Sequence, residues 1–466
     1  MISQPFPKTE KFLFGFLLFT LFWLPLSLGG NRPWAWSLMQ VSFFLQGALL
    51  VLTQPHFFQS LYAKYKWFIF LWLGFLACQL INTIPLPYAF IEFLRPERLA
   101  ELANAPKGSK WIALSFDVGQ SQITLMKSFA YCVLFFLSLS LINSPQRLKF
   151  TLITISAAGI CQGIYGSLEV LSGIKQSIIF ELPVTHIATG SFVYKNHYAN
   201  YLLLTLSAAI GYLIATMHIT KTGTKRERLR RLIKFWLSNK VLFRIGIIVM
   251  VLALVMSRSR MGNSAFFFSM TLTATLGLIY FKPRQKSYIT LFVSMLIIDI
   301  LIVSSLFGLK QVQQRLEQTS FTQESRDEVI ADALPLLGEH PLLGFGGGTF
   351  YTIYPHVQNQ TIQHFYDHAH NEYLQFSLEF GLVGALLLAL LVILCAKSSI
   401  SAIRRRRHPL PRGVAFASFM AILGMALHAT VDFPLQASAN AALFIVLLSL
   451  GVISNTISMR FQHNKV

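Results

Sequence analysis

The most regular feature of this sequence is a series of long apolar segments separated by short polar ones. A helix needs about 20 mostly apolar residues to cross a bilayer, and about twelve segments have that character. They are residues 11–29, 35–54, 67–86, 121–143, 150–172, 197–217, 241–257, 262–281, 287–309, 373–396, 413–433 and 438–457. The pattern predicts an all-α, polytopic membrane protein with about 12 transmembrane helices.

Two of the polar connections are long enough to carry structure outside the bilayer. They are residues 87–120 and residues 310–372, the latter between the ninth and tenth predicted spans. The sequence contains no internal repeat and no low-complexity linker, so we expect one integral membrane domain over residues 1–466. Because functional residues often lie on loops held by a rigid scaffold, the longer connection is the first place to look for a site.

The positions of the charges indicate how the predicted helices are oriented across the membrane. Of the 466 residues 54% are hydrophobic and 12% are charged, yet the formal net charge is +20, which alone would also suit a nucleic-acid-binding protein. Every alternate connection is instead basic, as cytoplasmic loops are. These connections carry Lys8, Lys11, Lys64, Lys66, Arg147, Lys149, the run 221–244, Lys282, Arg284, Lys286, Lys397, Arg404–Arg407, Arg412, Arg460 and Lys465.

This distribution predicts that both termini are cytoplasmic and that residues 87–120 and 310–372 face the periplasm. The run KTGTKRERLRRLIKFW (221–236) suits an anchor on an anionic membrane surface. We therefore expect membrane lipids as partners, and no nucleic acid.

A short helix is predicted within the longer loop. Ser325 and Glu328 have the spacing of a capping box, and the apolar periodicity that follows ends at Gly338. Arg326 shares a face with the apolar stripe, at a helix N-terminus whose dipole favours anions.

The sharpest local pattern is HNEYLQFSLEFGLVG (370–384), a His-Asn pair followed after nine residues by Gly-x-x-Gly. Other distinctive stretches are FVYKNHYANYL (192–202), SRSRMGNSAF (257–266), the run from Arg326 through HPLLGFGGGTF (340–350), and HATVDFPLQASANAALF (428–444). In this order they resemble the motifs of the O-antigen ligase and polymerase superfamily. The resemblance covers roughly residues 185–445.

The resemblance implies a glycosyltransferase of the bacterial inner membrane whose active site faces the periplasm. Such an enzyme moves a glycan, with inversion and without a metal or cofactor, from an undecaprenyl-diphosphate carrier to an acceptor hydroxyl. The acceptor is lipid A–core in a ligase, another lipid-linked repeat in a polymerase, and a protein in a pilin O-glycosyltransferase. The sequence favours the ligase but does not reveal the acceptor. A solute transporter, which also commonly has twelve spans, is the alternative from another class.

Individual roles follow from the same resemblance. It implies that His370 is the general base, since an imidazole can take a proton from a hydroxyl near neutral pH. It also implies that cations bind the diphosphate, and that three further polar residues orient substrate. The cations are Arg260, Arg326, Arg258 and Lys195, and the orienting residues are Asn371, His197 and Asp432.

Several of these residues also have purely structural interpretations. Asn371 could cap the following helix, Arg258 and Arg260 could extend to the membrane interface, and His428 could form an ion pair with Asp432. Two other motifs are weaker. GFGGG (344–348) lacks the ending of a P-loop and suits a tight turn, whereas a zinc site could be formed by His364, Asp367, His368 and His370.

Overall fold

The computed structural model describes residues 8–459 apart from positions 55, 96–110, 185, 217–238, 282–288, 291–292, 294–296, 298–325, 361 and 363. Ten of the described helices are long and apolar enough to cross a membrane. They are α1 (Lys8–Trp23, extended by a 3-10 turn to Leu26), α2 (Pro33–Thr53), α3 (Phe57–Thr83), α6 (Val118–Leu141), α7 (Pro145–Ser172), α8 (Lys195–Ala215), α11 (Arg260–Tyr280), α16 (Glu372–Arg405), α17 (Pro409–His428) and α18 (Ser438–Thr456).

The chain is therefore an all-α, multi-pass membrane protein, as the apolar segments predict. An eleventh helix, α10 (Asn239–Met256), carries a shorter apolar stretch. The predicted span at 287–309 falls almost entirely outside the described residues, and the basic run at 221–236 lies wholly outside them.

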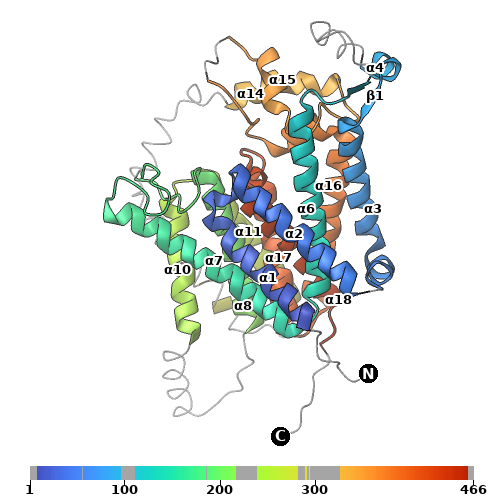
Figure 1. Cartoon of the computed structure of the whole chain (residues 1–466). Helices are drawn as coiled ribbons and strands as arrows, with labels where there is room; N and C mark the ends of the chain where they lie inside the picture. Colours follow the sequence, from blue (N-terminus) through green and yellow to red (C-terminus); the bar gives the residue numbers. More distant parts are fainter. Residues whose placement is uncertain are drawn as a thin grey trace, which may run out of the picture.

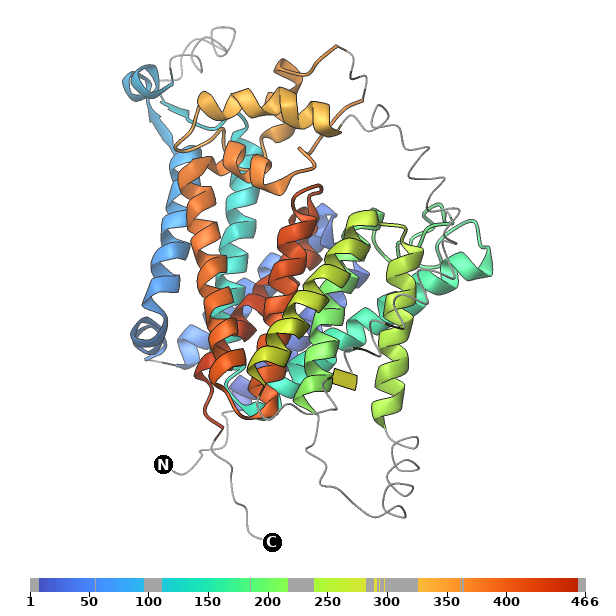
Figure 2. The ribbon, with the colours of Figure 1, turned by 180° about the vertical axis from the view of Figure 1, so that it is seen from behind.

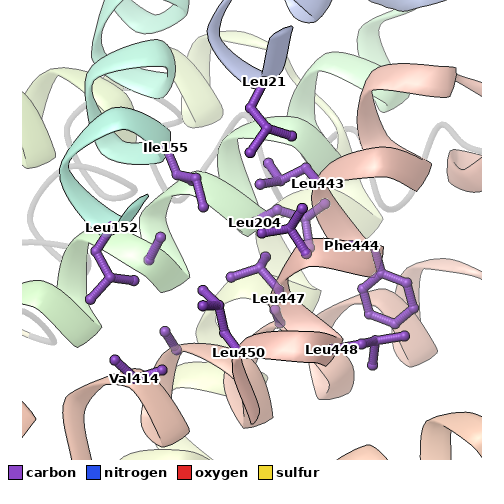
Figure 3. Packing of buried hydrophobic residues seen from close by; sticks show 14 of the residues in the cluster. Leu21, Leu152, Ile155, Leu204, Val414, Leu443, Phe444, Leu447, Leu448 and Leu450 are labelled. Carbon is purple, nitrogen blue, oxygen red and sulfur yellow. The ribbon is translucent and has the colours of Figure 1, made fainter. Parts of the chain in front are cut away.

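Helices α8, α17 and α18 form the centre of the bundle and are buried along most of their length. Figure 3 shows how leucines of α8 and α18 pack against those of α1 and α7, for example Leu204, Leu447 and Leu152. Helices α3, α6 and α16 stand side by side at one edge of this centre, as Figures 1 and 2 show from opposite sides. The first residues of α1 and the last of α18 lie at the same end of the bundle.

The opposite end, which we call the site end, carries a small structure with its own apolar core. It consists of α14 (Arg326–Ala333), a 3-10 turn (Leu334–Gly338) and α15 (Phe350–Ile353). Its buried side chains include Val329, Phe345 and Tyr354, and they pack against Leu374 and Leu378 of α16. We refer to residues 326–371 as the cap. The helix predicted after Arg326 is confirmed, and Pro335 lies where its α-helical part gives way to the 3-10 turn.

A break in α16 fastens the cap to the bundle. Gly381 has φ 67° and ψ 173° in the middle of this 34-residue helix, so the backbone groups around it lose their helical partners. Residues 341–346 take their place: Leu382 N–H donates to Pro341 O at 2.7 Å, and Phe345 N–H donates to Leu378 O at 2.8 Å. The GFGGG segment forms part of this contact. Gly344, Gly346 and Gly348 all have positive φ, which confirms the predicted tight turn.

The other predicted loop contains elements that the sequence did not indicate. A two-stranded antiparallel sheet pairs β1 (Pro85–Pro87) with β2 (Trp111–Ala113), and α4 (Tyr88–Leu94) follows β1. The guanidinium group of Arg95 donates to Leu114 O and to Gly344 O, which joins this loop to the cap. Residues 96–110 of this loop lie outside the described residues.

The break predicts a strong effect of adding one methyl group. A Cβ at Gly381 would lie 2.2 Å from Leu342 O, and its φ and ψ belong to a region that only glycine adopts readily. We expect Gly381→Ala to lower the free energy of unfolding by at least about 1–3 kcal/mol, measured by thermal unfolding in detergent. Gly338→Ala is the control, because nothing lies within 4 Å of its Cβ position. Equal melting temperatures for the two variants would contradict the importance of the break.

Candidate active site

His370 lies at the site end, at the point where the cap enters α16. Its φ of 50° is in the left-handed region, which is strained for a residue with a side chain. The imidazole packs edge-on against Phe433, with ring centroids 4.8 Å apart, and against Tyr366. Its Nδ1 atom is 3.8 Å from Oδ1 of Asp432, and the two side chains are 14% and 2% exposed. A histidine and a carboxylate, both largely removed from water, therefore face each other.

Asp432 is held by donors from two separate parts of the chain. It belongs to the turn between α17 and α18, where its Oδ1 accepts from Phe433 N–H at 2.9 Å. Its Oδ2 accepts from the Tyr194 hydroxyl at 3.2 Å and from the Asn196 amide. Asn196 also donates to the Tyr194 hydroxyl at 2.7 Å. Because these donors compensate its burial, the carboxylate is fixed in position beside His370.

Arg326, at the start of α14, joins the same network. Its Nη2 donates to the Tyr194 hydroxyl at 3.4 Å. Burial lowers the pKa of His370 to about 4, and the positive charge of Arg326 is the next contribution. Both effects disfavour the imidazolium. At neutral pH His370 is therefore uncharged and able to accept a proton, next to a cation that can bind an anion.

The other predicted cations lie close to this network. Lys195 is the first residue of α8, directly after Tyr194. Arg258 and Arg260 occupy the turn between α10 and α11, where Ser259 caps α11 by accepting from Gly262 N–H at 3.2 Å. Like His370, Arg258 has a φ of 50°. A Cβ at Gly262 would lie 2.6 Å from that of Ala199 in α8, so this turn packs against the first turns of α8.

Two of the predicted orienting residues have clear structural contacts. Asn371 is the N-cap of α16, and its side chain accepts from Leu374 N–H at 3.1 Å, as the capping interpretation predicts. His197 is buried, and its Nε2 lies 3.2 Å from Phe433 O, so it supports the turn that carries Asp432. Their roles in substrate orientation stay predictions.

The proposed ion pair between His428 and Asp432 is wrong. It assumed that both residues lie on one helical face, but α17 ends at His428 and the chain then turns. His428 Nδ1 instead lies 3.1 Å from the Asn200 amide nitrogen. Asp432 consequently faces His370 and not His428.

Sequence reasoning missed Glu372, Tyr194 and Asn196. Glu372 Oε1 accepts from Leu435 N–H at 2.6 Å, and Glu372 N–H donates to Ala429 O at 2.9 Å, so this residue fastens the Asp432 turn to the start of α16. All three residues occur inside motifs that the sequence analysis singled out, but no spacing within those motifs indicates that Tyr194 and Asn196 contact Asp432.

The zinc interpretation lacks a ligand set in the part of the chain that is described. There, no group of three or more His, Cys, Asp or Glu side chains is arranged to hold a metal ion. His364 is exposed, while His368 stacks on Phe433 with a centroid distance of 4.3 Å.

The N-cap hydrogen bond of Asn371 predicts that stability responds in a graded way to substitution at this position. Asn371→Ala should lower the free energy of unfolding by about 0.5–2 kcal/mol, because the Leu374 N–H loses its acceptor. Asn371→Asp keeps an acceptor oxygen and should unfold like the wild type. Thermal unfolding of the purified variants in detergent measures both. An Ala variant as stable as the wild type would show that this N-cap hydrogen bond contributes nothing to stability.

Comparison with known proteins relates part of this chain to one family. The sequence model of the O-antigen ligase family matches residues 245–389, and no curated protein matches the chain. The matched region contains the Arg258–Arg260 turn, Arg326, His370 and the break at Gly381, whereas Asp432 lies outside it. Residues 245–389 therefore carry an O-antigen ligase domain, which supports a membrane glycosyltransferase of the ligase and polymerase type.

Proposed function

We propose that this protein is an O-antigen ligase of the bacterial inner membrane. It would transfer a glycan from undecaprenyl diphosphate to a hydroxyl group of lipid A–core, at the periplasmic face. The observation that carries this proposal is the imidazole of His370 facing the buried carboxylate of Asp432, with Arg326 hydrogen-bonded to the same network. A base and a cation at one site are what this reaction requires.

The base acts on the acceptor. As the acceptor oxygen attacks the anomeric carbon of the donor, its proton passes to Nε2 of His370, and the bond from that carbon to the diphosphate oxygen breaks. Nδ1 faces Asp432 at 3.8 Å and finds no other hydrogen-bond partner among the described residues. The carboxylate would therefore orient the ring and stabilise the imidazolium that forms, as in a catalytic triad. Attack opposite the leaving group inverts the anomeric centre.

The cations act on the leaving group. A departing diphosphate gains negative charge, and guanidinium groups stabilise it through paired N–H donors. Arg326 would be the principal contact because it donates to the Tyr194 hydroxyl, which in turn donates to Asp432 beside His370. Arg260, Arg258 and Lys195 would supply further positive charge from the neighbouring helix ends.

The glycolipids of a deletion strain test the reaction and the acceptor together. A ligase predicts loss of long chains from lipid A–core and accumulation of lipid-linked polymer. Chains that stop at one repeat would instead indicate a polymerase, and loss of pilin glycosylation a protein acceptor. A strain with unchanged glycans would contradict the proposal and favour a transporter.

If His370 is the general base, its substitution should cause a large loss of activity. His370→Asn should slow transfer by about 10²–10⁴-fold, because asparagine tolerates the left-handed backbone but cannot take the proton. His370→Ala should behave in the same way. His364→Ala, at an exposed histidine of the same loop, is the matched control and should keep full activity. Transfer by purified protein with a lipid-linked donor measures all three, and near-normal rates for His370→Asn would exclude the general-base role.

Two charged residues near His370, Arg326 and Asp367, shift its pKa in opposite directions, so their substitution should shift the pH dependence of activity in opposite directions. Activity should rise with pH around the His370 pKa of about 4, since only the unprotonated imidazole accepts a proton. Arg326 lowers this pKa and Asp367 raises it. Arg326→Gln should therefore move the acid limb of kcat/KM to higher pH, and Asp367→Asn should move it to lower pH.

Arg404→Gln provides the control, because this arginine lies in the last turn of α16, far along the helix from His370. Its acid limb should coincide with that of the wild type. Shifts in the same direction for Arg326→Gln and Asp367→Asn would mean that His370 does not control the limb.

A further inference from the structure

A cavity of about 770 Å³ lies inside the bundle, between α6 and α16, with α3, α17 and α18 completing its walls. Its lining changes along its length. The polar lining residues belong to the site end of α6, the first turns of α16 and the turn before α18, whereas the remainder of the wall is formed by aromatic and aliphatic side chains such as Phe380, Leu391 and Phe444. The cavity therefore has the polarity of an amphiphile, with a polar end and a long apolar interior.

The polar end of the cavity adjoins the His370 site. Glu372 lines the cavity and is two residues from His370, and its hydrogen-bond partner Leu435 lines the cavity as well. Lys127 also lines it, about two and a half turns into α6. The positive charge of Lys127 adds to the burial that lowers the pKa of His368, which places this lysine near the loop that carries the base.

Lys127 is the one basic side chain among the described residues that line this cavity. Of the two glutamates in the wall, Glu379 accepts from the Gln375 amide at 2.9 Å and Glu372 accepts from Leu435 N–H through Oε1, while Oε2 of Glu372 has no hydrogen-bond partner among the described residues. Lys127 Nζ instead lies 4.9 Å from the ring centre of Trp36, and the described residues place no carboxylate oxygen within 4.0 Å of it. A lysine inside a membrane span is costly and usually functional, so an anion is expected here.

We propose that Lys127 binds a phosphate group of a polyprenyl phosphate lipid whose hydrocarbon chain occupies this cavity. The inference rests on the proposed function and adds a positioning residue to it. Arg326 would contact the diphosphate from the cap, and Lys127 would contact it from within the bundle. The leaving group would thus be held from two sides, with its chain in the apolar part of the cavity.

The position of the cavity favours the carrier of the donor over the acceptor lipid. In a polyprenyl diphosphate the chain joins the diphosphate directly, so a diphosphate near His370 requires an apolar space immediately beside it. In lipid A–core the reacting hydroxyl is separated from the acyl chains by the core sugars. The cavity begins at Glu372, next to His370, and therefore matches the first arrangement.

Binding of a lipid that cannot react tests this proposal. The full chain in phosphatidylcholine nanodiscs would be titrated with labelled decaprenyl monophosphate. Lys127→Met, which keeps the length of the side chain and removes its charge, should weaken binding by about tenfold to a hundredfold. Lys127→Arg should retain most of it. Lys66→Met is the matched control, because Lys66 also lies over a tryptophan ring but outside the cavity. Thermal unfolding confirms that each variant is folded.

Two further ligands, decaprenol and dipalmitoyl phosphatidate, show which part of the lipid is recognised. Decaprenol, which lacks the phosphate, should bind wild type and Lys127→Met equally. Ala389→Trp, which fills part of the apolar end of the cavity, should weaken the binding of both decaprenyl monophosphate and decaprenol. The proposal is overturned if Lys127→Met binds decaprenyl monophosphate like the wild type, or if dipalmitoyl phosphatidate displaces it with equal affinity.

These binding results are independent of catalysis. Binding that depends on Lys127 in a protein without glycan transfer would support the lipid site and overturn the proposed function. Transfer that depends on His370, together with binding that ignores Lys127, would overturn the lipid site alone.

Discussion

The site depends on one exchange of backbone hydrogen bonds at the break in α16. Polar backbone groups cannot be left unpaired in hydrocarbon, so a transmembrane helix can break only where other groups replace its hydrogen bonds. Residues 341–346 do so at Gly381, through bonds to both sides of the break. The segment from Glu372 to Phe380 is thereby separated from the rest of α16 and packed beneath the cap. His370 and Arg326 both belong to the cap that this contact holds in place.

The residues of the site are polar, largely buried and mutually dependent. Asp432 tolerates burial because Tyr194, Asn196 and a backbone N–H donate to it. Glu372 ties the same turn to α16. The left-handed backbone of His370 is likewise sustained by its surroundings, since Asn371 caps the helix that follows and Phe433 packs against the ring. Strain of this kind persists only where neighbouring contacts enforce it, and it often marks functional residues.

Local patterns predicted the helices well because the length and polarity of a segment decide whether it can cross a bilayer. Most observed helix ends lie within a few residues of the predicted ones, and α16 is longer because it continues through Ser398 to Arg405. The break at Gly381 could not be predicted in the same way. A glycine in an apolar segment is compatible with an intact helix, and the groups that replace its bonds come from residues about 40 positions earlier.

The candidate site was predictable in part for a similar reason. His370, Arg326 and Asp432 stood out because they belong to recognisable motifs, and the fold does bring them together. The pairing of Asp432 was predicted wrongly, since helical spacing was extended past the end of α17 at His428. Its actual donors, Tyr194 and Asn196, lie more than 230 positions away in the chain. Only the packing of α8 against α17 and α18 makes them neighbours.

The lengths of the contacts show which part of the site is fixed and which can adjust. Within the bundle they are short: Asn196 lies 2.7 Å from the Tyr194 hydroxyl, and Phe433 N–H lies 2.9 Å from Asp432. The contacts that the side chains of Arg326 and His370 make with the bundle are longer, at 3.4 Å from Arg326 to Tyr194 and 3.8 Å from His370 to Asp432. Hydrogen bonds of catalytic groups are often long without substrate and shorten when it binds. The buried carboxylate thus has a fixed position in the bundle, and the side chains of the base and the cation can shorten their contacts with it and with Tyr194 when substrate binds.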